Sequence, residues 1–598
     1  MRQFLITVLG VIVGGFIFLF LLFILFAGIG AAAGAAFGDK AADKGASGST
    51  VLTLDLRRGM LDHSGGASLF GDTPSSVVET VRALNRAKTD DKIKGLFIRT
   101  GFGIAPASAE EIRLAMHDFK SSGKFVVVHS QGFEATSILP YMAVTAADEI
   151  WQQATTGFAT TGLNSETGFY GGVFEKYDAK AQFAQFHEYK NMANVYMQSD
   201  FTDAHREATT SYLSSIYDTA VAHIAKDRNK TEAEIEALLN ASPHSAEDAY
   251  EAGLIDKLGH YIDAQNSVKE RVKRISGEDT KFLTVAKYGP GLNVIGDVVA
   301  FIGGQGAVTM GSSQDASNPF SSGISMGGDT LSKAFIKAAK DKKVKAIVFR
   351  VSSPGGSATA SDQIHNAVQI AKDADKPIVI SMGQYAASGG YYVAANADKI
   401  VAMPTTITGS IGVVGGKIAL RDTYAKLGYN VEGISIGGPM ANAYSGDEPW
   451  TQAQFKMFRD QMEDIYVDFT QLVATGRNIP IERVREIAKG RVWTGAQAKE
   501  LGLVDELGGI MKAIEIAREL GGIDADAKIN LRKYPRPKSR TEQFETLFNA
   551  STEAAKDLQS LREITALPEV QAALKARAKA DAFARGEVVL EADIASVQ

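Results

Sequence analysis

From about residue 51 onward, the hydrophobic positions follow two patterns in turn, one typical of strands and one typical of helices. Short runs of β-branched and aliphatic residues, such as Val51–Leu56 and Ile378–Ile380, predict buried strands. Between such runs, apolar residues recur at the spacing of a helix face, for example Ile112, Ala115, Met116 and Phe119. Strands that alternate with helices indicate βαβ units, so we expect an α/β fold with mainly parallel sheets.

This pattern occurs twice along the chain. Asp91–Arg99 corresponds to Lys342–Arg350, and Glu251–Gly259 corresponds to Glu500–Gly508. Self-similarity over a long period indicates a duplicated structural unit. We expect two tandem domains, the first at residues 51–279 and the second at residues 280–530. Residues 531–598 have a different composition, rich in Ala, Lys, Arg and Glu, and are expected to form a peripheral helical tail.

The N-terminal segment Phe4–Ile29 is apolar and uncharged. Since a bilayer crossing needs about 20 such residues, residues 1–30 are expected to be a transmembrane anchor. The alternative is a cleaved signal peptide, because Ala31-Ala32-Ala33 resembles a cleavage site, although signal peptides carry only about 7–15 apolar residues. Residues 31–50, rich in Ala, Gly and Ser, are expected to be a flexible linker. The flanking charges do not fix the orientation of the anchor.

Composition narrows the classes of function. The formal net charge is -6 and charged residues make up 22% of the chain, so no nucleic acid partner is expected. The chain has no cysteine, which excludes disulfides, cysteine nucleophiles and thiolate metal sites. We expect neither a metal ion nor another cofactor.

Ser388 is the first candidate for chemistry. It lies between the predicted strand at Ile378–Ile380 and a helix start at Gly389-Gly390. A helix N-terminus has unpaired N–H groups and favours negative charge, which suits a nucleophile and its oxyanion. The alternative is a glycine-rich turn with an incidental serine. Gly355 and Gly356 offer further N–H groups at another predicted helix start.

The two copies differ where this chemistry is expected. In the first copy, Ser137 is followed by Ile138-Leu139 instead of the two glycines, so no backbone-lined oxyanion pocket is expected there. The second copy in turn lacks a lysine that the first copy has: Lys190 of the first copy corresponds to Gly438 of the second. We therefore expect the copies to face each other and to complete one site. An ordinary solvated lysine is the alternative interpretation.

A lysine can activate a serine only when its amine is neutral. Its pKa must fall from about 10.4 toward about 7–8, and burial has this effect because it disfavours the charged form. Glu188 counts against Lys190 if the segment is extended, because residues two apart share a face, unless the chain bends or Glu188 turns to solvent. Lys417, close in sequence to Ser410, is the second candidate for the base.

Four motifs together carry a resemblance to a known family. They are Ser352-Ser353-Pro354-Gly355-Gly356, Ala387-Ser388-Gly389-Gly390-Tyr391, Thr408-Gly409-Ser410-Ile411-Gly412 and Tyr189-Lys190. With them the chain resembles the long, tandem-repeat type of the signal peptide peptidase A family, peptidase family S49, over nearly all of residues 51–509. The resemblance implies the ClpP/crotonase fold and a serine protease with a Ser/Lys dyad.

The resemblance also implies roles for single residues. It makes Ser388 the nucleophile, Lys190 the general base, Ser410 the residue that orients the lysine, and Gly356 and Gly389 the region of the oxyanion donors. It implies peptide substrates, namely signal peptides left in the membrane after cleavage. It further implies a homo-oligomer, expected to be a tetramer, on the cytoplasmic membrane with its catalytic domain on the periplasmic side.

Three other functions stay open at this stage. A Ser-His-Asp hydrolase would use His129 or His365, although neither has a partner pattern in the sequence. An acyl-CoA enzyme on the same fold would use the paired glycines to polarise a thioester. A non-catalytic membrane scaffold would act through its oligomeric rim. A fluorophosphonate probe, which labels serine nucleophiles, separates a serine hydrolase from the last two classes.

Overall fold

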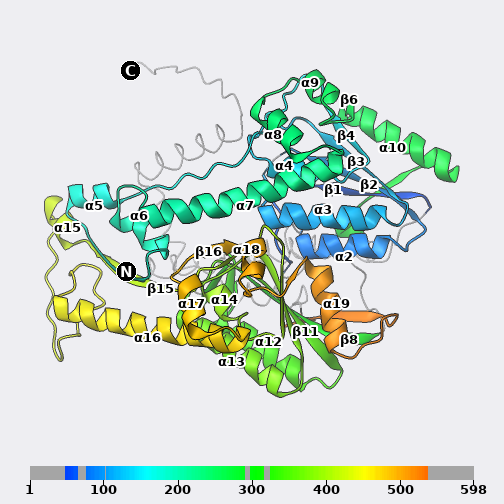
Figure 1. Ribbon diagram of the computed structural model, residues 1–598. Coiled ribbons are helices and arrows are strands. Elements are labelled where there is room, and N and C mark those ends of the chain that lie inside the picture. Colours follow the sequence, from blue (N-terminus) through cyan, green and yellow to red (C-terminus); the bar gives the residue numbers. More distant parts are fainter. Residues whose placement is uncertain (1–47, 65–75, 102, 290–295, 315–322, 537–598) are drawn as a thin grey trace, which may run out of the picture. The chain divides into compact units, whose positions relative to one another are not determined.

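The computed structural model describes residues 48–64, 76–101, 103–289, 296–314 and 323–536 (Figure 1). All helices and strands named below lie in one compact unit of the chain. The expected anchor at residues 1–30, nearly all of the linker and the tail beyond residue 536 lie outside the described residues. Among the residues that are described, no helix is long and apolar enough to cross a membrane.

The first copy is built on a six-stranded parallel sheet with the order β6-β4-β3-β2-β1-β7. Its strands are β1 (Thr50–Asp55), β2 (Ile93–Thr100), β3 (Phe125–Ser130), β4 (Glu149–Gln152), β6 (Lys257–Leu258) and β7 (Lys281–Thr284). The central strands are nearly continuous apolar runs because both faces of the sheet are covered. Since β7 pairs with β1, the first sheet extends past residue 279, where the repeat placed the end of the first copy.

The second copy has a larger sheet with the order β16-β14-β12-β11-β8-β18, to which β13 and β17 are added beside β12. Its strands are β8 (Asp297–Gln305), β11 (Val344–Ser353), β12 (Ile378–Ala387), β13 (Lys399–Ala402), β14 (Ile407–Gly409), β16 (Val492–Thr494), β17 (Glu506–Leu507) and β18 (Ile529–Tyr534). All pairs are parallel except β14 with β16. The last strand carries this sheet four residues beyond the expected boundary at residue 530.

The helices follow the expected βαβ order. The first copy has α2 (Val77–Ala87), α3 (Pro106–Lys120), α4 (Leu139–Met142), α5 (Gly171–Tyr177), α6 (Asn194–Met197), α7 (Asp203–Arg228), α8 (Glu232–Asn240), α9 (Ala246–Glu251), α10 (Tyr261–Ser276) and α11 (Val285–Tyr288). The second has α12 (Gly328–Lys340), α13 (Ala358–Asp373), α14 (Gly389–Tyr392), α15 (Arg421–Lys426), α16 (Gln452–Arg477), α17 (Ile481–Ile487), α18 (Gly495–Glu500) and α19 (Ile510–Leu520). The predicted apolar stripe of α3 is buried, which confirms that helix.

The helices form layers around the two sheets. Helix α10 packs on one face of the first sheet, against Phe97, Phe125 and Val127. Helices α2 and α3 cover the opposite face and belong to the same hydrophobic core as α19, which lies on the second sheet (Figure 1). Helices α12 and α13 belong to a separate core on the far face of that sheet. One core therefore runs from the first sheet to the second, so the two copies pack against each other.

Buried charges reinforce this contact between the copies. Arg350 of β11 is 1% exposed, and its guanidinium lies 2.7 Å from Asp62 and 2.8 Å from Glu111 of α3. The second oxygen of Glu111 accepts a hydrogen bond from the backbone N–H of Ile510 at 2.6 Å. A buried cation with two carboxylates and further hydrogen bonds requires that the partners keep their places. The network therefore fixes α3 of the first copy against the second sheet.

A two-stranded ribbon also joins the copies. Strand β5 (Lys180–Phe186) of the first copy pairs antiparallel with β15 (Val413–Ala419) of the second. A side chain at Gly416 would meet the ring of Phe183 at 2.5 Å, so a glycine is needed for this close cross-strand contact. Lys190 follows the end of β5, and Ser410 precedes the start of β15. Because these two strand ends are paired, the ribbon holds the two residues near each other.

Candidate active site

Ser388 lies in the tight turn between β12 and α14. Its backbone has φ +53° and ψ -120°, a conformation that costs a non-glycine residue about 1–3 kcal/mol. The turn is held because Ser388 N–H donates to the Gly409 carbonyl at 2.8 Å, while its own carbonyl accepts from Tyr391 and Tyr392 at 2.9 Å each. The strained turn leaves the serine half-buried, with its hydroxyl at the end of the strand.

Glycines pack tightly around this serine. A side chain at Gly355 would lie 2.7 Å from Ser388 Cβ, and one at Gly389 would lie 2.5 Å from Ser361 Oγ. The same position above Gly389 is 3.3 Å from the backbone nitrogen of Gly356, so the two glycines are close neighbours. Within the described part of the chain, neither the Gly356 nor the Gly389 N–H has a hydrogen-bond acceptor. Two free N–H groups beside a serine hydroxyl are suited to bind an oxyanion.

Lys190 brings the first copy to this serine. It follows β5, immediately before the 3₁₀ turn η1 (Asn191–Ala193), and is 6% exposed. Its Nζ lies 2.9 Å from Ser388 Oγ, 2.9 Å from the Ser410 carbonyl and 2.9 Å from Ser410 Oγ. Burial lowers the pKa of the amine from 10.5 to about 7. The structure thus brings together the serine, the lysine and the second serine named from the sequence.

Glu188 lies away from the amine of Lys190. Its carboxylate pairs with Lys489 at 2.9 Å near the surface, so the chain turns between residues 188 and 190. The lysine is therefore free of a carboxylate partner among the described residues, and desolvation is the cause of its lowered pKa. This is the arrangement that a neutral amine requires.

The other candidates lie elsewhere in the structure. Lys417 Nζ donates to the carbonyls of Ala443 and Ser445, both at 2.9 Å, and lies over the ring of Trp450. His129 packs edge-on against Tyr261, and His365 against Tyr392. None of these three side chains contacts Ser388.

The corresponding positions of the other copy lack the same geometry. Ser137 Oγ accepts a hydrogen bond from the N–H of Leu139 at 3.3 Å, and the side chain of Ile138 is fully buried in the core. Gly438, which corresponds to Lys190, is exposed with open space around it. The first copy therefore lacks the glycines beside its serine, and the second copy lacks the lysine. The two copies together supply one serine–lysine site.

The turn Lys489–Arg491 also contacts the site, and it was not singled out from the sequence. A side chain at Gly490 would lie 2.5 Å from Lys190 Cβ. The repeat contains a signal that would have found it: the correspondence of Glu500 with Glu251 places Gly490 opposite Ala241, so this glycine is another feature of one copy alone.

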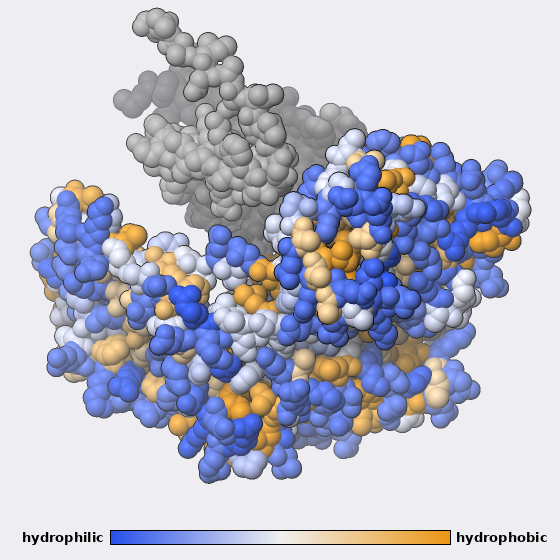
Figure 2. Space-filling model, turned by 45° about the horizontal axis from the view of Figure 1, so that its top comes forward, coloured by the Kyte–Doolittle hydropathy of each residue, from blue (hydrophilic) through white to orange (hydrophobic). Residues whose placement is uncertain are grey.

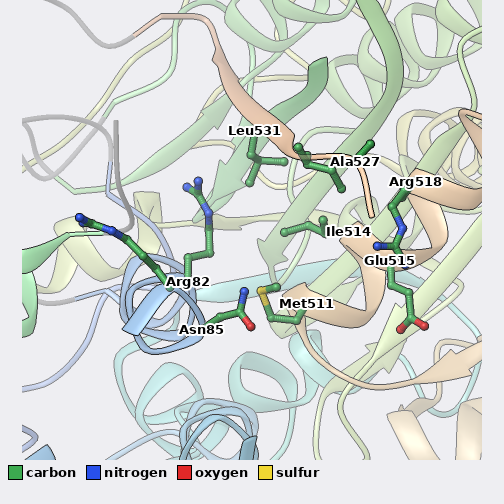
Figure 3. A pocket seen from close by; sticks show the side chains of 10 residues that line it. Arg82, Asn85, Met511, Ile514, Glu515, Arg518, Ala527 and Leu531 are labelled. Carbon is green, nitrogen blue, oxygen red and sulfur yellow. The ribbon is translucent and has the colours of Figure 1, made fainter. Parts of the chain in front are cut away.

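A cavity with different lining residues lies between the two copies. It has a volume of about 320 Å³ and lies between α2, α19 and β18. Figure 3 shows Arg82 and Arg518 on opposite sides of Ile514 in this cavity. None of its lining residues belongs to the serine–lysine site, so it is not the place where a peptide bond would meet Ser388.

Comparison with known proteins gives consistent matches. A model of peptidase family S49 matches residues 118–274 and again residues 370–524, and a Clp protease model matches residues 329–408. The chain is 30% identical over 500 residues to the chloroplastic serine protease SPPA of Arabidopsis thaliana, which covers 82% of this chain and 72% of that protein. It is 30% identical over 478 residues to Protease 4 of Salmonella typhi, covering 76% and 74% of the two chains. Protease 4 of Haemophilus influenzae is 27% identical over 463 residues, with 74% and 73% covered.

Two parallel-sheet copies, one of which presents a serine at a strand–helix turn, define a serine protease related to the Clp class. The family model matches both copies, and more than half of the chain in total. The chain belongs to peptidase family S49. This confirms the family and the serine protease class predicted from the sequence motifs.

Proposed function

We propose that the protein is a membrane-anchored endopeptidase that degrades cleaved signal peptides, with Ser388 as nucleophile and Lys190 as general base. The observation that carries the proposal is the 2.9 Å distance between Lys190 Nζ and Ser388 Oγ at a buried, carboxylate-free position. A lysine with a pKa of about 7 is largely neutral at slightly alkaline pH, which lets it accept a proton from the serine.

The hydrogen bonds around the amine suit this role. A neutral amine has two N–H bonds and one lone pair. Ser410 offers two acceptors, its carbonyl and its hydroxyl, each 2.9 Å from Nζ. If both N–H bonds of Lys190 are directed to Ser410, the lone pair is left for the hydroxyl proton of Ser388. Ser410 is thereby a positioning residue, in agreement with the role that the family resemblance implies.

The reaction then proceeds in two balanced stages. The hydroxyl of Ser388 transfers its proton to Lys190 while its oxygen attacks the carbonyl carbon of the peptide bond. The oxyanion accepts hydrogen bonds from the N–H groups of Gly356 and Gly389. Lys190 gives the proton to the leaving amine, the C–N bond breaks, and an acyl-enzyme forms. Water attacks the ester in the second stage, with the same lysine as base, and restores the serine.

Exposed apolar side chains supply a candidate surface for a homo-oligomer. The described surface in Figure 2 is mostly hydrophilic, with separate hydrophobic patches. The segment between α15 and α16 carries large apolar side chains in solvent, and Ile434 and Ile436 are 96% and 92% exposed. Exposed apolar side chains that gather in one segment favour contact with another protein surface. We propose that this segment contributes to a homo-oligomer, and that Phe4–Ile29 anchors it to the cytoplasmic membrane.

The test compares two lysine variants. Lys190→Met keeps the length of the side chain and removes the base, so turnover of a peptide substrate should fall by at least about 10³-fold, within the range for loss of base catalysis. Lys417→Met is the matched control and should keep wild-type turnover, because the amine of Lys417 contacts the carbonyls of Ala443 and Ser445 and the ring of Trp450 instead of Ser388. The wild-type rate should fall as pH drops through about 7, where the amine becomes protonated.

Labelling by a fluorophosphonate adds a readout that does not depend on the peptide. It should modify Ser388 in the wild type and be much slower in Lys190→Met. Near-wild-type turnover in Lys190→Met together with loss in Lys417→Met would place the base in the second copy. A protein that is never labelled would favour the scaffold or the acyl-CoA alternative.

A further inference from the structure

The turn Lys489–Arg491, between α17 and β16, forms backbone hydrogen bonds on the lysine side of the site. The Lys489 carbonyl accepts from His187 N–H at 3.1 Å and from Tyr189 N–H at 3.2 Å. These two residues belong to the first copy and lie three positions and one position before Lys190. The path of the chain into the lysine is therefore set by a carbonyl of the second copy.

The same turn forms hydrogen bonds on the side of the second serine. Gly490 N–H donates to the Ile411 carbonyl at 2.8 Å, and the Arg491 carbonyl accepts from Ser410 N–H at 2.7 Å. Ser410 has φ +49°, so its conformation is strained and needs such support. One short turn thus joins the backbone before Lys190 to the backbone of Ser410.

Gly490 lies directly against the lysine. Its φ is +80°, and a side chain there would lie 2.5 Å from Lys190 Cβ and 2.6 Å from its Cα and backbone nitrogen. Real Cβ atoms do not approach other atoms this closely, so only a glycine allows the two backbones to meet. The corresponding Ala241 in the first copy has φ -85° and ends α8, with no catalytic lysine to accommodate.

The side chain of Arg491 anchors the turn. Its guanidinium lies over the rings of Tyr189 at 4.8 Å and Trp493 at 4.4 Å, and it pairs with Glu207 of α7 at 2.7 Å. The charged groups around the lysine are thus paired with each other, Glu207 with Arg491 and Glu188 with Lys489, and neither carboxylate reaches Nζ.

We propose that the turn Lys489–Arg491 is the template that sets the lysine geometry, with Gly490 as its positioning residue. The proposal rests on the role of Lys190 as general base. The turn contacts both Lys190 and Ser410 and fixes the distance between them, although it touches neither the nucleophile nor the substrate. A displacement of the amine by about 1 Å is expected to cost roughly 100-fold in rate.

The experiment replaces Gly490 by alanine and uses Gly428→Ala as its control. Gly428 has φ +79° and nothing within 4 Å of the added side chain, so the control shares the backbone strain without the contact to Lys190. In Gly490→Ala, kcat should fall about 10- to 100-fold with KM within about threefold of wild type. The acidic limb of the pH–rate profile should move to higher pH, because a displaced, better solvated amine is more easily protonated. Gly428→Ala should change neither.

A second variant keeps the test decisive if Gly490→Ala does not fold. Arg491→Gln removes the pair with Glu207 and the stacking on Tyr189 without strain in the backbone, and it should lower kcat and shift the same limb in the same direction. Wild-type kcat and an unmoved limb in a folded Gly490→Ala or Arg491→Gln would overturn the proposal. If Lys190→Met is inactive in that case, only the turn is misassigned. An active Lys190→Met would instead overturn the function on which the turn depends.

Discussion

At the scale of single residues, the proposed site combines several features that lower the stability of the fold. Lys190 has three oxygen neighbours and is buried without a counter-ion among the described residues, while Ser388 and Ser410 adopt positive φ angles. Each of these features costs stability. Replacing Lys190 should therefore stabilise the fold.

The first prediction concerns Lys190→Met and the pH dependence of stability. The pKa of the lysine is about 7 in the folded protein and near its ordinary 10.5 when unfolded, so the unfolded chain binds more protons between these values. The wild type is thus penalised most at pH 7 and below, and least near pH 10.5. Lys190→Met should raise the free energy of unfolding at pH 7 by an amount on the order of a few kcal/mol, since one pKa unit corresponds to about 1.4 kcal/mol. Tm should rise with it, and the rise should be larger at pH 7 than at higher pH. Thermal unfolding at pH 7 and pH 9.5 checks this, and a gain in Tm that does not shrink with pH would contradict it.

At the scale of elements, helix α3 has a double role. It covers one face of the first sheet, and its carboxylates reach into the second copy. Glu111 contacts Arg350, while Glu110 accepts hydrogen bonds from the Thr405 N–H at 3.0 Å and its hydroxyl at 2.7 Å. Thr405 lies just before β14, the strand that leads to Ser410. The helix of one copy thus supports the strand that carries a residue of the site.

Arg350→Met tests this connection. The change would leave Asp62 and Glu111 buried without their cation, which typically costs about 3–5 kcal/mol. Arg99→Met is the matched control, because Arg99 is the corresponding residue of the first copy and stacks on Tyr261 at 4.4 Å. Urea denaturation should show a large loss for Arg350→Met and at most about 1 kcal/mol for Arg99→Met. Equal losses would show that the buried network does not hold the copies together.

The elements also show what the sequence could predict. Strands and helices could be predicted from the spacing of apolar residues. Burial of one face of a helix, or of a strand in a sheet, requires apolar residues at regular intervals along the chain, as in α3. Strand β12 runs on to Ala387, beyond the expected Ile380, because its last residues pair with β14, and such pairing is decided by residues distant in sequence. The same holds for the pairing of β5 with β15 and for the turn at Gly490, whose effect lies in Lys190. Ser388 and Lys190 could be named because the two copies differ in complementary ways at these positions.

At the scale of the whole molecule, every residue of the proposed catalytic site lies within the described residues. Deletion of residues 1–30 should therefore yield a soluble, oligomeric and active enzyme, since the first sheet begins only at Thr50. Light scattering after size-exclusion chromatography and peptide turnover measure both properties. Replacement of both Ile434 and Ile436 by serine in the truncated protein should weaken the oligomer, because it removes two almost fully exposed apolar side chains. A truncated protein that is monomeric and inactive would show that the anchor takes part in assembly.

The separation of the lysine and the serine along the chain has a consequence for biosynthesis. Lys190 leaves the ribosome 198 residues before Ser388, and Gly490 follows later still. A growing chain that already contains the lysine has no nucleophile to activate, and one that already contains the serine still lacks the turn against which the lysine packs. If the proposed mechanism holds, proteolytic competence arrives only after the turn at Gly490 has been synthesised.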